Sequence, residues 1–227
     1  MEELKFFTDK TVVNDYLLVK IKDYWKMKDF SQWKEVFIDP GVYDLTKSDK
    51  FNWEGKINIP EFLDSLPENH YFSWDYPCDM NPKYTDLFLD KTFVNAQIYQ
   101  DHPQYIVTTQ YRFNDYWNFV GNFNCYNNFD IKSGILALGN MCRFRTLNQY
   151  LKHALDYAFS HTKHPRIHIY GLCLKGILYA VKLAKQFDIG LSVDNTKWTF
   201  MYYEQDSKDR QVQFNLYLEK IKYKEVV

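Results

Sequence analysis

Short apolar runs recur along the chain, and each is three or four residues long. Most are followed at once by Asp, Gly or Thr, and their apolar residues are continuous rather than alternating with polar ones. Continuous runs of this length are typical of strands that are buried on both faces, as in a parallel sheet. The pattern predicts strands at residues 36–38, 71–74, 105–107, 135–138, 167–170 and 191–193.

Helical periodicity appears between these runs. Residues 146–160 place Leu147, Leu151 and Leu155 on one face, and residues 175–187 carry a similar apolar face. Residues 81–100 and 14–27 show weaker helical patterns. Residues 211–218 alternate and fit either a last strand or the start of a last helix.

Strand and helix patterns alternate six or seven times, which favours an α/β fold with a mostly parallel sheet. Two architectures fit: a (β/α)-barrel and a doubly wound open sheet. The chain has neither a G-x-G-x-x-G sequence after its first strand nor a Walker A sequence. No low-complexity linker divides the 227 residues, so we expect a single domain over residues 1–227.

Composition narrows the function classes only slightly. The formal net charge of −1 gives no support to nucleic-acid binding, although Arg143 and Arg145 could form a local basic patch. The four Cys lack zinc-finger spacing and are typical of reduced thiols in an intracellular protein. The sequence starts with a charged segment and has no apolar run long enough to cross a membrane, so we expect a cytoplasmic protein without membrane contact.

Polar residues follow several of the predicted strands. Asp39 and Asp194 come directly after apolar runs, and Asp75 and Gln110 follow two others. In a (β/α)-barrel these strand ends meet at one rim, where active sites lie. Asp at a strand end is also common as a turn or helix-capping residue. Two carboxylates on one rim can act as nucleophile and proton-transfer group at an anomeric carbon.

These segments resemble, in order and spacing, the motifs of queuine- and archaeosine-type guanine transglycosylases. Residues 38–43 (IDPGVY) resemble the D-S-G-G-F segment, residues 73–75 (SWD) the second acidic strand end, and residues 107–110 (VTTQ) the V-Q-G segment. Residues 135–141 (ILALGNM) and 167–172 (IHIYGL) resemble two glycine-containing strand ends. Residues 192–199 (SVDNTKWT) are similar to the late motif of the short DNA-modifying branch found in phages and bacterial gene clusters.

The resemblance implies a (β/α)8 TIM barrel, compact and either complete or incomplete, that exchanges guanine in nucleic acid for a 7-deazaguanine such as preQ0. It implies that Asp194 is the nucleophile on C1′ and that Asp39 moves the proton. It also implies a set of substrate-binding residues. Asp75 and Gln110 would bind the base edge, Gly139, Asn140 and Gly171 would complete that recognition, and Tyr43 and Met141 would enclose the base ring.

The chain also departs from the family pattern. Pro40 replaces Ser, Val42 replaces the second Gly of the first motif, and Tyr111 replaces the Gly after the V-Q pair. The 33 residues after Asp194 contain no Cys and no His, so we expect no zinc and no cofactor. The family's additional RNA-binding domains are also missing, which favours DNA over tRNA as the substrate. The free 7-deazaguanine is the other expected partner, and an oligomer is compatible with the family.

Three alternatives remain open at this point. The protein could be a non-catalytic partner subunit of such an enzyme, or an N-glycosidase that removes a base with the same two carboxylates. It could also be an α/β domain without catalysis. His168 lies inside an apolar run and is interpreted as a core histidine.

Overall fold

The computed structural model describes residues 4–41, 57–78, 82–194 and 208–225. All pairings between its strands are parallel, which confirms an α/β fold with parallel sheets. The strands are β1 (Lys5–Phe7), β2 (Tyr16–Lys20), β3 (Glu35–Asp39), β4 (His70–Phe72), β5 (Val107–Thr109), β6 (Ile135–Leu138), β7 (Arg166–Ile169) and β8 (Gly190–Asp194).

The strands form two sheets. One has the order β1-β8-β7-β6-β5 and the other has the order β2-β3-β4. Single parallel bridges join the edges of the two sheets. Thr8, directly after β1, pairs with Leu17 of β2, and Phe72 of β4 pairs with Tyr105, which precedes β5. In both sheets the carboxyl ends of the strands therefore point the same way.

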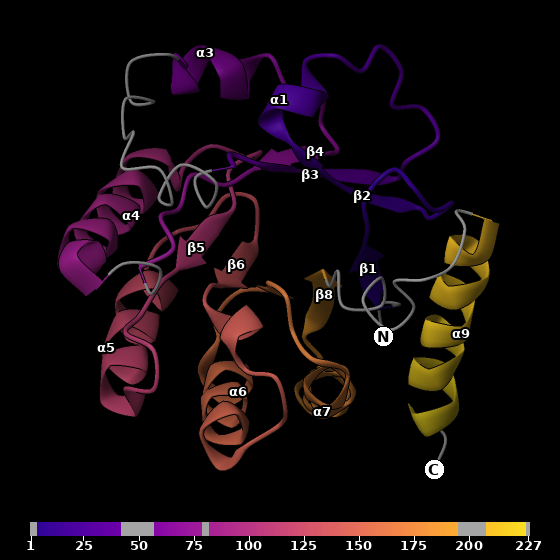
Figure 1. The fold of residues 1–227 in the computed structure, drawn as a ribbon. Helices are drawn as coiled ribbons and strands as arrows, with labels where there is room; N and C mark the ends of the chain where they lie inside the picture. The colour runs from indigo at the N-terminus through magenta and orange to yellow at the C-terminus, as the bar shows by residue number, and fades with distance from the viewer. Residues whose placement is uncertain (1–3, 42–56, 79–81, 195–207, 226–227) are drawn as a thin grey trace.

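Helices surround the strands on the outside (Figure 1). They are α1 (Ile21–Tyr24), α3 (Ile59–Asp64), α4 (Thr85–Tyr99), α5 (Tyr116–Asn127), α6 (Gln149–His161), α7 (Leu174–Phe187) and α9 (Lys208–Glu225). Short 3-10 turns lie at Pro82–Tyr84 and Met141–Arg143. None of the helices in the described part of the chain is both long enough and apolar enough to span a bilayer.

The predicted helices at residues 146–160 and 175–187 correspond to α6 and α7. Asn148 caps α6, since its side chain accepts a hydrogen bond from the backbone N–H of Leu151 at 2.8 Å. The buried face of α6 repeats at helical spacing through Leu151, Leu155 and Phe159. This periodicity explains why the sequence pattern located the helix.

The predicted helix at residues 14–27 is wrong. Tyr16–Lys20 is strand β2, and only Ile21–Tyr24 is helical. The burial of β2 alternates along the strand, and the strand pairs in register with β3. Pairing with β3 thus outweighs a weak helical pattern. The ambiguous segment at residues 211–218 belongs to helix α9.

Two apolar clusters hold the sheets together. The larger one lies mostly between strands and helices. The smaller one joins side chains from both sheets and from the segment before β5, and it consists of Phe7, Phe37, Ile106, Ile135 and Ala137. The rings of Phe7 and Phe37 are 3.9 Å apart between centroids.

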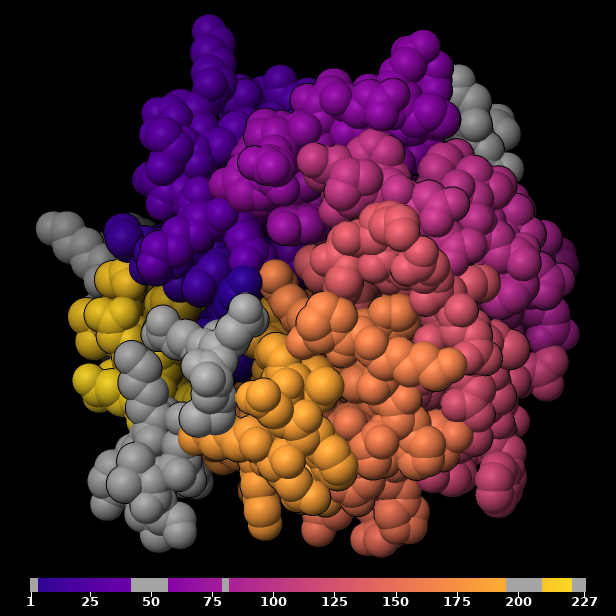
Figure 2. All heavy atoms as spheres, turned by 180° about the vertical axis from the view of Figure 1, so that it is seen from behind, coloured from indigo at the N-terminus to yellow at the C-terminus, as the bar shows by residue number. Residues whose placement is uncertain are grey.

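Helix α9 covers the first strand from outside. Phe214 and Tyr217 each place a ring centroid 5.7 Å from that of Phe6. Figure 2 shows the yellow atoms of α9 beside the indigo atoms of the N-terminal segment. Segments at opposite ends of the described chain are therefore packed against each other.

Candidate active site

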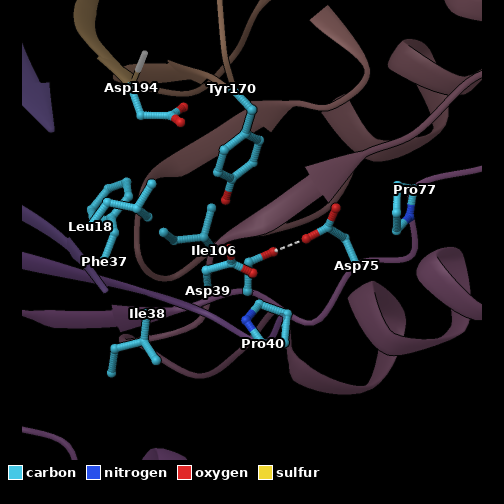
Figure 3. A pocket seen from close by; sticks show the side chains of 11 residues that line it. Leu18, Phe37, Ile38, Asp39, Pro40, Asp75, Pro77, Ile106, Tyr170 and Asp194 are labelled. Carbon is cyan, nitrogen blue, oxygen red and sulfur yellow. Dashed lines mark hydrogen bonds between the residues drawn. The ribbon is translucent and has the colours of Figure 1, made fainter. Parts of the chain in front are cut away.

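A pocket of about 140 Å³ lies at the carboxyl ends of the strands (Figure 3). Its volume is close to the roughly 150 Å³ of an engineered protein cavity that accommodates benzene. Polar groups and apolar walls both line it, and they come from Leu18, Phe37, Ile38, Asp39, Pro40, Ser73, Asp75, Pro77, Ile106, Tyr170 and Asp194. The pocket therefore draws on both sheets.

Three of the predicted site residues line this pocket together: Asp39, Asp75 and Asp194. Asp39 is the last residue of β3 and Asp194 is the last residue of β8. Asp75 lies three residues beyond the end of β4. The positions of these three acids at strand ends predict that they lie on one face, and the structure brings them into one cavity.

The turn after Asp39 explains the D-P-G sequence. One carboxylate oxygen of Asp39 accepts a hydrogen bond from the backbone N–H of Gly41 at 2.7 Å. Gly41 has a φ of +75°, a conformation that residues with a side chain seldom adopt. The turn fixes one oxygen of the carboxylate at the end of β3.

Asp75 is held by two side chains. Gln110 donates from Nε2 to its Oδ2 at 2.6 Å, and Ser73 donates from Oγ to its Oδ1 at 3.1 Å. Burial raises the pKa of Asp75 to about 6, the charge of Asp39 adds to this rise, and the hydrogen bonds from Gln110 and Ser73 oppose it. Near neutral pH this carboxyl group can therefore take up or release a proton.

Asp194 is fixed at the end of β8 by the backbone that follows β7. Its Oδ1 accepts a hydrogen bond from the backbone N–H of Gly171 at 2.9 Å. The Nε2 atom of the buried His168 lies 3.6 Å from the same oxygen. Gly171 has a φ of +65°, and a Cβ there would lie 2.4 Å from the Cβ of Cys142. Glycine is thus required at the position that anchors Asp194.

Gln110 and Gly139 support the pocket without lining it. Gln110 is buried and reaches the pocket through its hydrogen bond to Asp75. A Cβ at Gly139 would lie 2.5 Å from Nε2 of Gln110 and 2.8 Å from the carbonyl oxygen of Thr109. The glycine therefore leaves the space in which Gln110 contacts Asp75.

The side chains of Asn140 and Met141 do not line the pocket. Asn140 adopts a left-handed conformation and donates from Nδ2 to the carbonyl oxygen of Tyr111 at 2.7 Å. The sulfur of Met141 accepts a hydrogen bond from the Tyr111 hydroxyl at 3.1 Å, and its side chain is buried. Met141 therefore packs against Tyr111 and does not face the pocket. Tyr43, its predicted partner, lies outside the described residues.

Tyr170 is a pocket residue to which the sequence analysis gave no role. It directly follows β7, and its hydroxyl points into the cavity between the carboxylates (Figure 3). Burial raises the pKa of Tyr170 well above its ordinary value, and the nearby charge of Asp75 adds to this. The hydroxyl therefore keeps its proton and can both donate and accept a hydrogen bond. Its place at a strand end, like that of Asp39 and Asp194, was the signal that could have identified it.

The described residues contain no group of three or more His, Cys, Asp or Glu side chains placed to hold a metal ion. The four cysteines are free thiols. No model of a known protein family, no curated protein and no solved structure matches this chain. The pocket and the sequence motifs are therefore the features of this chain that indicate a function.

Proposed function

We propose that the two sheets form one closed (β/α)8 barrel with the pocket at its carboxyl-terminal mouth. Within each sheet, strands that are consecutive along the chain lie side by side, and β8 also pairs with β1. The bridges Thr8–Leu17 and Phe72–Tyr105 support closure at the two sheet junctions. Phe7, Phe37 and Ile106 then fill the interior, as side chains do in barrels of this size.

We further propose that the protein is a guanine transglycosylase that exchanges guanine in nucleic acid for a free 7-deazaguanine. One observation carries this proposal: Asp39, Asp75 and Asp194 line a single small pocket beside Tyr170. Three acids in a partly apolar cavity repel one another and lose solvation, so their convergence favours a chemical role over a structural one.

The first step forms an ester. An oxygen of Asp194 bonds to C1′ of the target nucleotide while the bond from C1′ to guanine N9 breaks. The bonding electron pair stays on guanine, which takes a proton from Asp39. The carboxylate traps an oxocarbenium-like state, as in retaining glycosidases.

The second step reverses these changes with a different base. N9 of the 7-deazaguanine gives its proton to Asp39 and bonds to C1′. The ester C–O bond breaks, and its electron pair returns to Asp194 as a carboxylate. Both acids then have the protonation state in which they started, so no cofactor is consumed.

Asp75 and Gln110 are suited to recognition of the base edge. Asp75 accepts hydrogen bonds from donors when ionised, and its pKa of about 6 also lets it act as a donor when protonated. Tyr170 and the apolar walls limit the access of water to the ester, whose hydrolysis would leave an abasic site.

DNA is the preferred nucleic-acid substrate in this proposal. That preference derives from the likeness of residues 192–199 to the DNA-modifying branch of the family. A duplex base cannot reach a pocket at the mouth of a barrel, so the target nucleotide has to be single-stranded or flipped out of the helix.

The test is incubation of the protein with guanine-containing DNA or tRNA and a labelled 7-deazaguanine. Asp194→Asn and Asp39→Asn are compared with wild type, because Asn keeps the shape of the side chain and removes its charge. Asp130→Asn is the matched control, since the side chain of Asp130 is 81% exposed and lies outside the pocket.

We expect label to enter DNA with wild type and with Asp130→Asn. Asp194→Asn should lose activity on the order of 10³-fold or more, as expected for loss of a nucleophile. Abasic sites without label would indicate an N-glycosidase that uses the same acids. Neither label nor abasic sites with any nucleic acid would refute the enzyme proposal and favour a partner subunit.

A further inference from the structure

His168 is a fully buried side chain for which the mechanism above has no role. It lies in β7, and its ring is 4.8 Å from Phe37 and 4.5 Å from Tyr170 between centroids. These surroundings are largely aromatic. A buried imidazole normally has hydrogen-bond partners, so a partner is expected for each of its two nitrogens.

The Nδ1 atom has a partner on the next strand. It lies 3.0 Å from Oγ of Ser192, which is also fully buried. The same Oγ accepts a hydrogen bond from Nε of Arg166 at 3.0 Å. A guanidinium can only donate, so the single hydrogen of the Ser192 hydroxyl remains available for Nδ1 of His168.

The Nε2 atom faces the carboxylate of Asp194. It has no hydrogen-bond partner within the described part of the chain, and Oδ1 of Asp194 lies 3.6 Å away, beyond hydrogen-bond length. A lone pair on Nε2 would repel that oxygen, whereas an N–H there would be attracted to it. Both nitrogens thus favour the tautomer with its proton on Nε2.

We propose that His168 is a positioning residue for Asp194, and that it acts as a neutral imidazole whose Nε2–H is directed at Oδ1. The backbone N–H of Gly171 already binds Oδ1. Two donors on one oxygen would hold the carboxylate plane and leave Oδ2 to attack C1′. This inference rests on the proposed function, because it assigns Asp194 the role of nucleophile.

A neutral donor suits this role better than a charged one. An imidazolium would neutralise the nucleophile, while a neutral N–H orients it and leaves its charge in place. Burial lowers the pKa of His168, with the interactions of Asp194 opposing that effect, so the neutral form persists through the physiological range. The separation of 3.6 Å can shorten when substrate binds, as catalytic hydrogen bonds often do.

The first test does not depend on activity. The protein is labelled with ¹⁵N-histidine, and the signal of His168 is identified by its loss in His168→Gln. We expect an Nε2–H tautomer at pH 7, a change in the Nε2 resonance in Asp194→Asn, and a larger Nδ1–H fraction in Ser192→Ala. The exposed His153 should be unaffected by both substitutions. An Nδ1–H tautomer or an imidazolium in the wild type would overturn the proposal.

The second test uses the exchange assay. His168→Phe keeps a ring but removes the donor, and His168→Gln retains a donor near the position of Nε2. We expect kcat to fall about 10- to 100-fold in His168→Phe, KM to change little, and His168→Gln to recover part of the loss. An unchanged kcat in a folded His168→Phe would refute the positioning role. If wild type shows no exchange, the proposed function fails, and the tautomer measurement still decides whether His168 faces Asp194 as a donor.

Discussion

The substitution Asp75→Asn should make the protein more stable above neutral pH. In the wild type, burial raises the pKa of this carboxyl from 3.8 to about 6. Below pH 3.8 Asp75 is protonated in both the folded and the unfolded states, and the pKa shift has no effect on the free energy of unfolding. As the pH rises, Asp75 loses its proton first in the unfolded chain. The free energy of unfolding therefore falls until the pH exceeds about 6, the pKa of Asp75 in the folded protein.

The size of the effect follows from the shift. About two pKa units at 1.36 kcal/mol per unit give about 3 kcal/mol, and roughly half of this arises between pH 5 and pH 8. The value is an upper limit, because the pocket opens to solvent. Asn remains neutral at every pH and can still accept the hydrogen bond from Gln110, so the variant avoids this loss.

Urea denaturation of both proteins between pH 5 and pH 8 measures the difference in free energy of unfolding. Using the difference removes contributions that the two proteins share. One of these is His70, whose pKa is lowered to about 4 by burial and which destabilises the fold as pH falls. The stability advantage of Asp75→Asn should increase with pH, and that of Asp130→Asn should stay constant. A constant difference for Asp75→Asn would show that the ionised form of Asp75 is not penalised in the folded protein.

Two further predictions concern the support of the pocket and an ion pair at the amino ends of β3 and β7. Gly139→Ala should cost about 1–3 kcal/mol and raise the pKa of Asp75 further, because the new Cβ displaces Gln110, whose hydrogen bond lowers that pKa. Gly121→Ala, in helix α5 with open space around it, should be neutral or stabilising, and equal effects of the two substitutions would contradict this reasoning. Glu35→Gln should cost about 3 kcal/mol in urea denaturation, because the buried Arg166 loses the carboxylate that it contacts at 2.7 Å; a loss below about 1 kcal/mol would show that the pair contributes little.

The sequence predicted the acids of the pocket better than it predicted their surroundings. Asp39 and Asp194 were identified because each is the last residue of a continuous apolar strand, and parallel strands bring such ends together. Side-chain direction after a strand is less predictable. Met141 is turned under Tyr111 by the left-handed Asn140 and the 3-10 turn that follows it, which no periodicity indicates.

The first two strands, β1 and β2, were also missed. Strand β1 has only three residues, and its partner β8 lies near the other end of the described chain. Strand β2 was mistaken for a helix because its pairing with β3 depends on contacts beyond its own sequence. His168 was correctly placed in the interior, but its proximity to Asp194 follows from the register of β7 with β8. Local patterns contain no information on that register.

The pairing of β1 with β8 has a consequence for the order in which the chain folds. Lys5 lies opposite Ser192, and the ring of Phe6 packs against Phe214 of helix α9, so the first strand has to wait for residues that the ribosome makes much later. Contacts of such long sequence separation form slowly, and unpaired strand edges are prone to aggregate in the meantime. Strands β2 to β4 and β5 to β7 can pair earlier, as each finds its partner nearby in the sequence. A nascent chain that stalls before β8 would therefore expose Phe6, and recruitment of chaperones should concentrate at that stage of synthesis.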